Sequence, residues 1–285
     1  YVCLYHDSAA IEGDNMIVFV ERSIFGDIPS GMYNIIHGRR KDFDKIIKRI
    51  VLTGKSGVEK PDDPECMNFD YLREGTVVAS CSLAKARAVL PFADTDPIQP
   101  AFNGVYFNGY YAASDSRRLA YLGEVTDNNG GFIMPYPFVK DATHETIDFI
   151  ETLNGTFARS GNLYAKVTDG RFPDVKRVIP EETNDSFEIL PHISDALALT
   201  KAPTFKCSLI NGETFAGVDN IPFQFTAGVL PYNIGFNVSY LIDAVKMTGS
   251  TTVHTLNQMS PMVIKGIDCD HPTAIIMPIP IIKGE

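Results

Sequence analysis

The chain of 285 residues is 45% hydrophobic and carries a formal charge of −10, with 25 Lys and Arg against 35 Asp and Glu. That length and hydrophobic content suffice for a sizeable buried core, whereas the acidic balance excludes a protein that coats nucleic acid with its entire surface. The sequence has no run of about 18 apolar residues and no basic leader before a hydrophobic stretch, so we expect a soluble, cytoplasmic protein.

Five cysteines are scattered through the chain, an odd number without a C-x-x-C pair. This spacing is typical neither of a disulfide framework nor of a zinc site. We therefore expect reduced thiols and no bound metal or other cofactor.

The first predicted elements are apolar strands at residues 1–5 and 16–22, on either side of the turn-forming residues 12–15. A strand at 32–36 and an amphipathic helix at 43–50 follow. This first stretch therefore ends in a strand followed by a helix.

Two later stretches each open with a strand and a helix. A strand at 76–80 precedes a helix beginning at Ser82, and a strand at 187–190 precedes a helix at 191–199. Both stretches then pass through further strands and reach a second strand and helix, like the pair that ends the first stretch.

This second strand-and-helix pair recurs at a nearly fixed period. Its register marks lie 99 and 102 residues apart, at Tyr33, Phe132 and Ile234. The helices predicted after these strands span residues 43–50, 147–153 and 241–247. Because such a period suits a whole small domain, the sequence predicts three related α+β modules, each with two helices packed on antiparallel sheet. We place them at residues 1–72, 73–182 and 183–285.

The first module is short at its start. Only 32 residues precede Tyr33, whereas Ser80 and Phe132 are 52 positions apart. On this count the opening strand and helix of the first module, roughly twenty residues, lie outside the chain. We expect a chain that is trimmed at its beginning.

Four segments have an unusual composition for purely structural sequence: AASDSRRLAYL at 112–122, DGRFPDVKRVIP at 169–180, GFNVSYLIDA at 235–244 and AIIMPIPI at 274–281. Each segment taken alone also suits a purely structural interpretation, such as a turn with a solvated Arg, a helix cap, or an edge strand protected by proline. Together, and in this order, they resemble the bacterial sliding clamp, the beta subunit of DNA polymerase III. The resemblance covers nearly the whole chain, although the first module matches only from its second strand onward.

The resemblance implies a fold of three repeated α+β modules per chain, with two chains closing head to tail into a homodimeric ring around duplex DNA. It also implies a processivity factor without chemistry of its own, which tethers DNA polymerase and clamp-loader subunits through short clamp-binding peptides. If the opening segment of the first module is truly absent from the protein, we expect instead a monomer or an open assembly.

Partner peptides of this family insert spaced apolar side chains into a cleft between modules two and three, which needs apolar walls and a few polar groups. Carried across by motif, the expected cleft residues are Phe102, Ser114, Arg118, Leu119, Pro173, Arg177, Val178, Asn237, Tyr240, Met277, Pro278 and Ile279.

The inner face of such a ring is basic and holds the DNA backbone without sequence readout. The candidate DNA-facing residues are Arg39, Arg40, Lys41, Lys45, Lys48, Arg49, Lys85 and Arg87. For any one of them, an ordinary solvated helix face is an equal alternative. The predicted helix at 141–153 is acidic, which argues against a uniformly basic lining.

The chain departs from the family pattern in two places. Family members commonly carry Gly-His where this chain has Ser116 and Arg117, and they usually end within a residue or two of the last motif, whereas this chain continues through 282–285. These departures suit a divergent phage or mobile-element clamp that serves its own polymerase.

A metal-dependent nucleic-acid hydrolase is a more remote alternative. It rests on the acidic and histidine residues of 268–271, and on the pairs Asp94/Asp96 and Glu181/Glu182. Adjacent residues of one extended segment point to alternating sides, so 268–271 is a poor candidate for a single ion.

Overall fold

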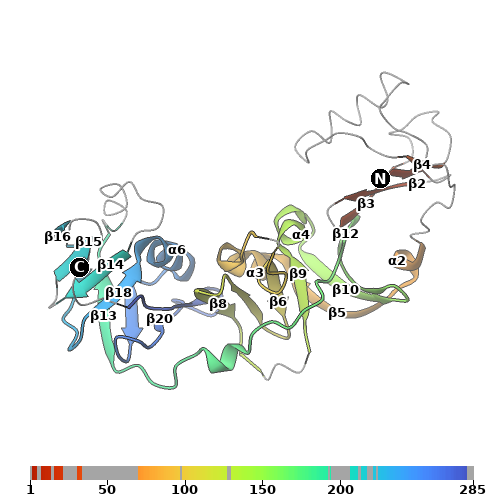
Figure 1. The fold of residues 1–285 in the computed structure, drawn as a ribbon. Helices are drawn as coiled ribbons and strands as arrows, with labels where there is room; N and C mark the ends of the chain where they lie inside the picture. The colour runs from red at the N-terminus through yellow and green to blue at the C-terminus, as the bar shows by residue number, and fades with distance from the viewer. Residues whose placement is uncertain are drawn as a thin grey trace. The chain divides into compact units, whose positions relative to one another are not determined.

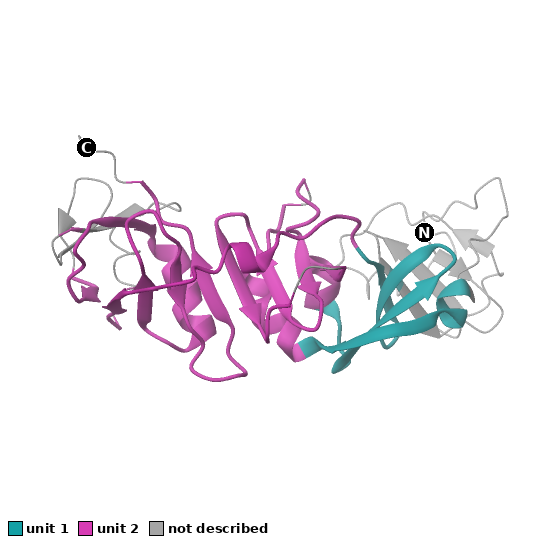
Figure 2. Cartoon of the chain, turned by 90° about the horizontal axis from the view of Figure 1, so that it is seen from below, with its two compact units in different colours: residues 1–83, 141–167 teal, residues 84–140, 168–285 magenta. Residues whose placement is uncertain are grey.

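A computed structural model shows the fold (Figure 1). It describes residues 2–4, 8–13, 16–21, 31–33, 70–96, 98–126, 130–191, 193, 206–210, 213–216, 221–222 and 224–280. The chain forms two compact units, residues 1–83 with 141–167 and residues 84–140 with 168–285 (Figure 2). The division into three modules and the boundaries of these modules stay a prediction.

The first unit is built on an eight-stranded antiparallel sheet in the order β4-β1-β2-β3-β12-β11-β10-β5. Its strands are β1 (Val2–Leu4), β2 (Ser8–Gly13), β3 (Met16–Glu21), β4 (Gly31–Tyr33), β5 (Thr76–Ser82), β10 (Thr146–Thr152), β11 (Gly155–Ser160) and β12 (Leu163–Lys166). The short helix α2 (Asp70–Glu74) buries Leu72. Leu72 packs with four buried sheet residues, Ile17, Ile150, Phe157 and Tyr164.

The second unit contains a nine-stranded sheet in the order β17-β13-β19-β20-β21-β8-β7-β6-β9. Its strands are β6 (Gly104–Phe107), β7 (Tyr111–Ser114), β8 (Arg118–Leu122), β9 (Phe132–Pro135), β13 (Asp185–Ile189), β17 (Thr226–Ala227), β19 (Thr252–Thr255), β20 (Met262–Ile264) and β21 (Thr273–Ile276). A four-stranded sheet, β16-β15-β14-β18, comprises β14 (Lys206–Ile210), β15 (Glu213–Ala216), β16 (Ile221–Pro222) and β18 (Ile234–Asn237).

Short helices accompany these sheets. They are α3 (Leu83–Val89), the 3-10 turns η3 (Leu90–Phe92) and η4 (Val175–Arg177), α4 (Tyr136–Asp141) and α6 (Val238–Thr248). The longest, α6, has a defined start and end. The Asn237 side chain accepts a hydrogen bond from Ser239 N (2.9 Å), and Gly249 ends the helix in the left-handed region at φ 70°. One apolar face of α6 is buried, comprising Val238, Leu241, Ile242 and Ala244.

Several predicted elements are confirmed, namely the strands at β1, β3, β4, β5 and β13 and the helices at α3 and α6. Strand β2 was not predicted, and it takes Glu12 and Gly13 from the predicted turn. The predicted helix at 43–50, and all of the one at 191–199 except 191 and 193, lie outside the described residues.

The predicted helix at 147–153 is wrong. Residues 146–152 form strand β10, and the helix after β9 is α4, which begins eleven residues earlier than predicted, at Tyr136. The segment TIDFIET alternates well enough to bury Ile147 and Phe149 on one face, and it pairs with a strand on each side. The acidic helix expected at 141–153 is therefore absent, and Asp148 and Glu151 are strand residues.

Asp148 on β10 is directly opposite Ser80 on β5 and Arg159 on β11. Its carboxylate accepts hydrogen bonds from Ser80 Oγ (2.8 Å) and Arg159 Nη2 (2.7 Å). The hydrogen bond from Arg159 holds the pKa of Asp148 below its ordinary value of 3.8. The ionised carboxylate therefore stabilises the sheet.

Replacing Asp148 by Asn is expected to lower the free energy of unfolding at pH 7 by about 1 kcal/mol, since a half-buried ion pair is lost. A lowered folded-state pKa stabilises the protein above the unfolded value of 3.8 and loses this effect as the pH falls through the folded-state pKa. Urea unfolding at pH 7 and at about pH 3 should show the difference between variant and wild type shrinking in acid. Glu145→Gln, an exposed change in the same unit, is the control; an equal difference at both pH values would contradict the prediction.

Candidate functional site

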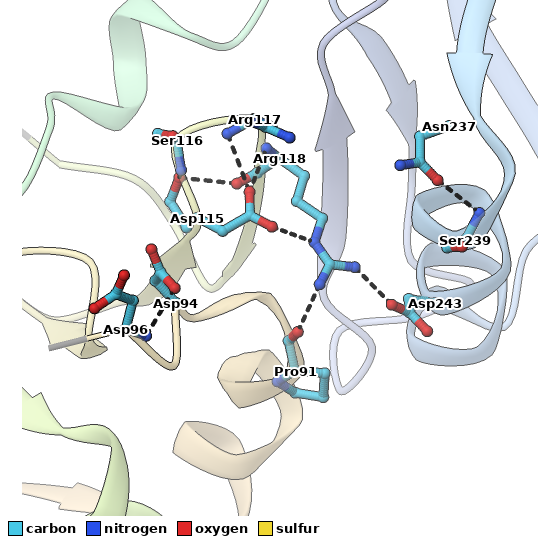
Figure 3. A network of polar contacts seen from close by, with 11 residues as sticks. Pro91, Asp94, Asp96, Asp115, Ser116, Arg117, Arg118, Asn237, Ser239 and Asp243 are labelled. Carbon is cyan, nitrogen blue, oxygen red and sulfur yellow. Dashed lines mark hydrogen bonds and ion pairs between the residues drawn. The ribbon is translucent and has the colours of Figure 1, made fainter. Parts of the chain in front are cut away.

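The turn between β7 and β8 is shaped by two of its own side chains (Figure 3). Ser114 Oγ donates to the carbonyl of Arg118 (2.8 Å) and accepts from Ser116 N (3.1 Å). Asp115 Oδ1 accepts from the backbone N–H groups of Arg117 and Arg118, both at 3.0 Å. Hydrogen bonds within the chain itself therefore fix the conformation of the turn.

Arg118 makes three polar contacts with its guanidinium (Figure 3). Nε donates to Asp115 Oδ2 (2.8 Å), Nη1 to Asp243 Oδ2 (2.6 Å) and Nη2 to the carbonyl of Pro91 (3.2 Å). The side chain is only 12% exposed. These contacts join strand β8 to helix α6 and to the turn η3.

Two aromatic rings lie against the same guanidinium. Its Cζ lies 4.6 Å from the ring centroid of Phe92 and 4.5 Å from that of Tyr240. Both distances are within the range of cation–π attraction. Phe92 is fully buried and Tyr240 is partly exposed. Arg118 therefore contacts a core residue of η3 and a partly exposed residue of α6.

The last described segment of the chain follows β21 along this site. Ile276 is paired with Arg118, Met277 N donates to the carbonyl of Arg117 (3.0 Å), and Ile279 N donates to that of Gly235 (2.8 Å). Since β21 pairs with both β20 and β8, the edge-strand alternative for this segment is wrong. The Met277 side chain is 43% exposed and is available to a partner.

A cluster of aromatic residues lies on the other side of β8. The Phe172 ring stacks on Tyr106 at 4.9 Å and meets Phe102 edge-on at 6.4 Å. Burial raises the pKa of Tyr106, and raises that of Tyr110 to about 12, so both phenols are neutral at ordinary pH. Leu119 belongs to this cluster, which joins it to the Arg118 contacts through adjacent positions of β8.

The turn η4 borders this aromatic cluster. Asp174 caps it by accepting from Lys176 N (3.2 Å), and its other oxygen pairs with Arg177 Nε at 3.2 Å. Val178 packs against the cluster, whereas the Arg177 side chain is 85% exposed. Arg171 is exposed, as the interpretation of 169–173 as a turn with a solvated Arg expects, whereas Phe172 in the same segment is buried in the cluster.

All of the expected cleft residues lie in the second unit. The structure joins Arg118 to Tyr240, and it ties the backbone of Met277 and Ile279 to the turn and to β18. Asn237 is the N-cap of α6, and Ser114 is buried within the turn. Phe102, Leu119 and Val178 belong to the aromatic cluster or pack beside it. Their roles in binding stay a prediction.

The sequence interpretation missed four groups that hold Arg118: the side chains of Phe92, Asp115 and Asp243 and the carbonyl of Pro91. One signal was present, because Asp243 follows Tyr240 by three positions and thus shares its face of α6. The carbonyl contact of Pro91 has no sequence signal.

Of the candidate DNA-facing residues, Lys85 and Arg87 are described, and both are exposed on α3. Arg87 donates to the carbonyls of Val139 (3.1 Å) and Lys140 (2.8 Å) near the end of α4, where a cation is favourable. The other candidates, Arg39, Arg40, Lys41, Lys45, Lys48 and Arg49, lie outside the described residues.

Two of the acidic motifs behind the hydrolase alternative, 268–271 and Asp94/Asp96, make local hydrogen bonds. Asp268 Oδ1 accepts from the backbone of Asp270 (2.9 Å) and lies 2.7 Å from His271 Nδ1, while Asp94 Oδ1 accepts from Asp96 N (2.9 Å). In the described part of the chain, no three His, Cys, Asp or Glu side chains are grouped so that they could hold a metal ion. Within the same residues, no helix has both the length and the apolar character needed to cross a membrane.

Ser116 adopts a left-handed backbone conformation with φ 71°, at the position where the related family commonly has Gly. Ser116→Gly is expected to raise the free energy of unfolding by about 0.5 kcal/mol, because relief of the left-handed strain exceeds the extra flexibility of the unfolded chain. Thermal unfolding checks this, with Ser116→Ala as the control that removes the hydroxyl and keeps the strain. Destabilisation by Gly would contradict the prediction.

Similar proteins share this fold. The DNA polymerase III beta chain of Streptococcus pneumoniae superimposes with a TM-score of 0.66 over 98% of this chain and 91% of that chain, at 18% identity. The sliding clamp of Bacillus subtilis gives 0.65 over 99% and 90%, at 16% identity. A Helicobacter pylori beta clamp bound to a DNA ligase peptide gives 0.60 over 98% and 91%, at 15% identity. The predicted α+β clamp fold is confirmed.

Sequence similarity points the same way. No protein-family model matches the chain. The beta sliding clamp of Halalkalibacterium halodurans is 26% identical over 226 residues, which cover 65% of this chain and 59% of that clamp. The chain is thus similar to bacterial sliding clamps in sequence and shares their fold. The clamp of Vibrio cholerae is 27% identical over 137 residues, which cover 40% of this chain and 36% of that clamp. Each match therefore spans less than two thirds of the length of the curated relative. Neither the mobile-element alternative nor the hydrolase alternative gains support from these relatives.

Proposed function

We propose that the chain is a sliding clamp, a non-catalytic processivity factor that encircles duplex DNA and tethers DNA polymerase and other partners by short peptides. The observation that carries this proposal is a surface of the second unit formed by Tyr240, Met277 and the β7–β8 turn. A backbone hydrogen bond ties Met277 to the turn, and Arg118 of β8 contacts the Tyr240 ring and donates to Asp243 of the same helix. This surface combines partly exposed apolar side chains with fixed polar groups on a clamp fold.

The proposed ligand is an extended or turned peptide with spaced apolar side chains. Met277 is 43% exposed and Tyr240 is partly exposed, and Phe102 and Val178 are also half-buried. Half-buried apolar groups lose water when a partner side chain covers them, which favours binding. Because only a few such anchors are covered, we expect an affinity on the order of micromolar.

Encirclement of DNA requires a closed ring, which we propose is a homodimer that pairs the first module of one chain with the third module of the other. Sequence-independent contact with the phosphate backbone would come from basic residues such as Lys85, which is exposed on α3. A cytoplasmic location, where the replication machinery works, is part of the same proposal.

Fluorescence anisotropy of a labelled peptide with the motif Gln-x-x-Leu-x-Phe tests the partner site. We expect saturable binding to the wild type and at least about tenfold weaker binding to Met277→Ala, because a central anchor is lost. Met259→Ala is the matched control, since Met259 is also exposed (58%) but lies outside the proposed site. Absence of binding by the folded wild type, or equal loss in both variants, would overturn the proposed site.

A further inference from the structure

The guanidinium of Arg118 is held on every side by the protein itself. Three polar contacts occupy its edges, to Asp115, Asp243 and the carbonyl of Pro91. The rings of Phe92 and Tyr240 lie 4.6 and 4.5 Å from Cζ. With 12% of the side chain exposed, Arg118 has little surface for a partner. Its position in the site therefore needs an explanation other than direct contact.

The two carboxylates that hold Arg118 each lead to a residue with a partly exposed apolar side chain. Asp115 fixes the β7–β8 turn through two backbone N–H groups, and the turn carbonyl of Arg117 holds Met277 N. Asp243 is on α6, three positions after Tyr240, and both residues hold the same guanidinium. Met277 and Tyr240, which come from separate elements, are thus linked through Arg118.

We propose that Asp243 and Asp115, acting through Arg118, are positioning residues that fix Tyr240 and Met277 in the geometry that accepts the partner peptide. This inference rests on the proposed function of the site. A ring that is already ordered before binding loses less conformational entropy when the peptide covers it. Arginine suits this task, because its planar fork can meet two carboxylates and stack on rings at the same time, which lysine cannot do.

The position of Asp243 allows a clean test. Its side chain is 43% exposed and reaches one partner, Arg118, in the contacts that the structure describes. Alanine is a better helix former than aspartate, so Asp243→Ala leaves α6 intact. Asp243→Glu keeps a carboxylate that can pair with Arg118, and Asp270→Ala removes an exposed carboxylate elsewhere in the second unit.

Peptide binding provides the first readout. We expect Asp243→Ala to bind the labelled Gln-x-x-Leu-x-Phe peptide about tenfold more weakly than the wild type, since a charge-assisted hydrogen bond to the guanidinium is lost. Asp243→Glu should restore most of the affinity, and Asp270→Ala should bind like the wild type. If Asp243 only stabilised the fold, Asp243→Ala would lower the melting temperature together with the peptide affinity. A loss of affinity at an unchanged melting temperature, restored by Asp243→Glu, therefore identifies a positioning role. Wild-type affinity in Asp243→Ala would overturn the inference and leave the proposed function standing.

Hydrogen exchange of the Arg118 Nη1–H group that donates to Asp243, followed by nitrogen-15 NMR in the absence of peptide, provides the second readout. We expect slow exchange in the wild type and in Asp243→Glu, and exchange at least about tenfold faster in Asp243→Ala, because the guanidinium is released. If the wild type binds no peptide, the proposed function fails, and this exchange still decides whether Asp243 orders the site. Equal exchange in all variants would overturn the positioning role.

Discussion

Replacing Gly104 by Ala is expected to lower the free energy of unfolding by about 3 kcal/mol. Gly104 is buried at the start of β6, opposite Pro135 of β9. A Cβ at this position would overlap the carbonyl oxygen of Met134, a backbone atom of the paired strand. The strand cannot yield without disturbing its hydrogen bonds to β6, so the strain is not relieved by a side-chain rotation.

The expected loss at Gly104 comes from this overlap and not from backbone conformation. Gly109→Ala provides the comparison, since Gly109 has a positive φ of 74° but nothing within 4 Å of the added Cβ. We expect that change to lower the free energy of unfolding by only about 1 kcal/mol. Chemical denaturation of both variants measures the difference. Similar losses at the two positions would show that the close approach of β6 to β9 is tolerated.

Gly104 also affects the proposed site. Its N–H donates to the carbonyl of Phe102 (2.9 Å), and Asn103 next to it accepts from Tyr136 N (3.0 Å). A displaced β6 would therefore move Phe102 relative to Phe172. This dependence on backbone packing has no signal in the motif that first indicated the site, because glycine in a strand suggests a close approach without naming the partner.

The motif segments located the site because they are contiguous in sequence. The segment 112–122 contains the β7–β8 turn and Arg118, and 235–244 contains the N-cap and first turns of α6. What joins the segments was not predictable. Arg118 and Asp243 are 125 positions apart, and their contact follows from the pairing of β8 with β21 and the packing of α6 on the same sheet.

The fold was predicted in outline from the strand pattern and the repeat, but the repeat also misled the interpretation. The apolar residues at 147, 150 and 153 are spaced three apart, as on one face of a short helix. The repeat also called for a helix near this place. The strands β5 and β11 on either side of β10 decide in favour of a strand. Tertiary pairing of this kind commonly overrides a short periodic pattern.

Arg118→Ala is expected to lower the free energy of unfolding by about 3 kcal/mol, the loss typical of removing one partner from a largely buried ion pair. Asp115, whose side chain is 17% exposed, would keep its charge without the cation, and the contacts with Phe92 and Tyr240 would be lost. Arg117→Ala is the matched control, since that side chain is exposed in the same turn, and its change should stay within about 0.5 kcal/mol. Urea unfolding compares the two; equal losses would mean that solvent replaces the contacts of Arg118. Arg118→Ala perturbs the fold, so weaker peptide binding by that variant would not show that Arg118 contacts the peptide. Met277→Ala changes an exposed side chain, so weaker binding by that variant does indicate a contact residue.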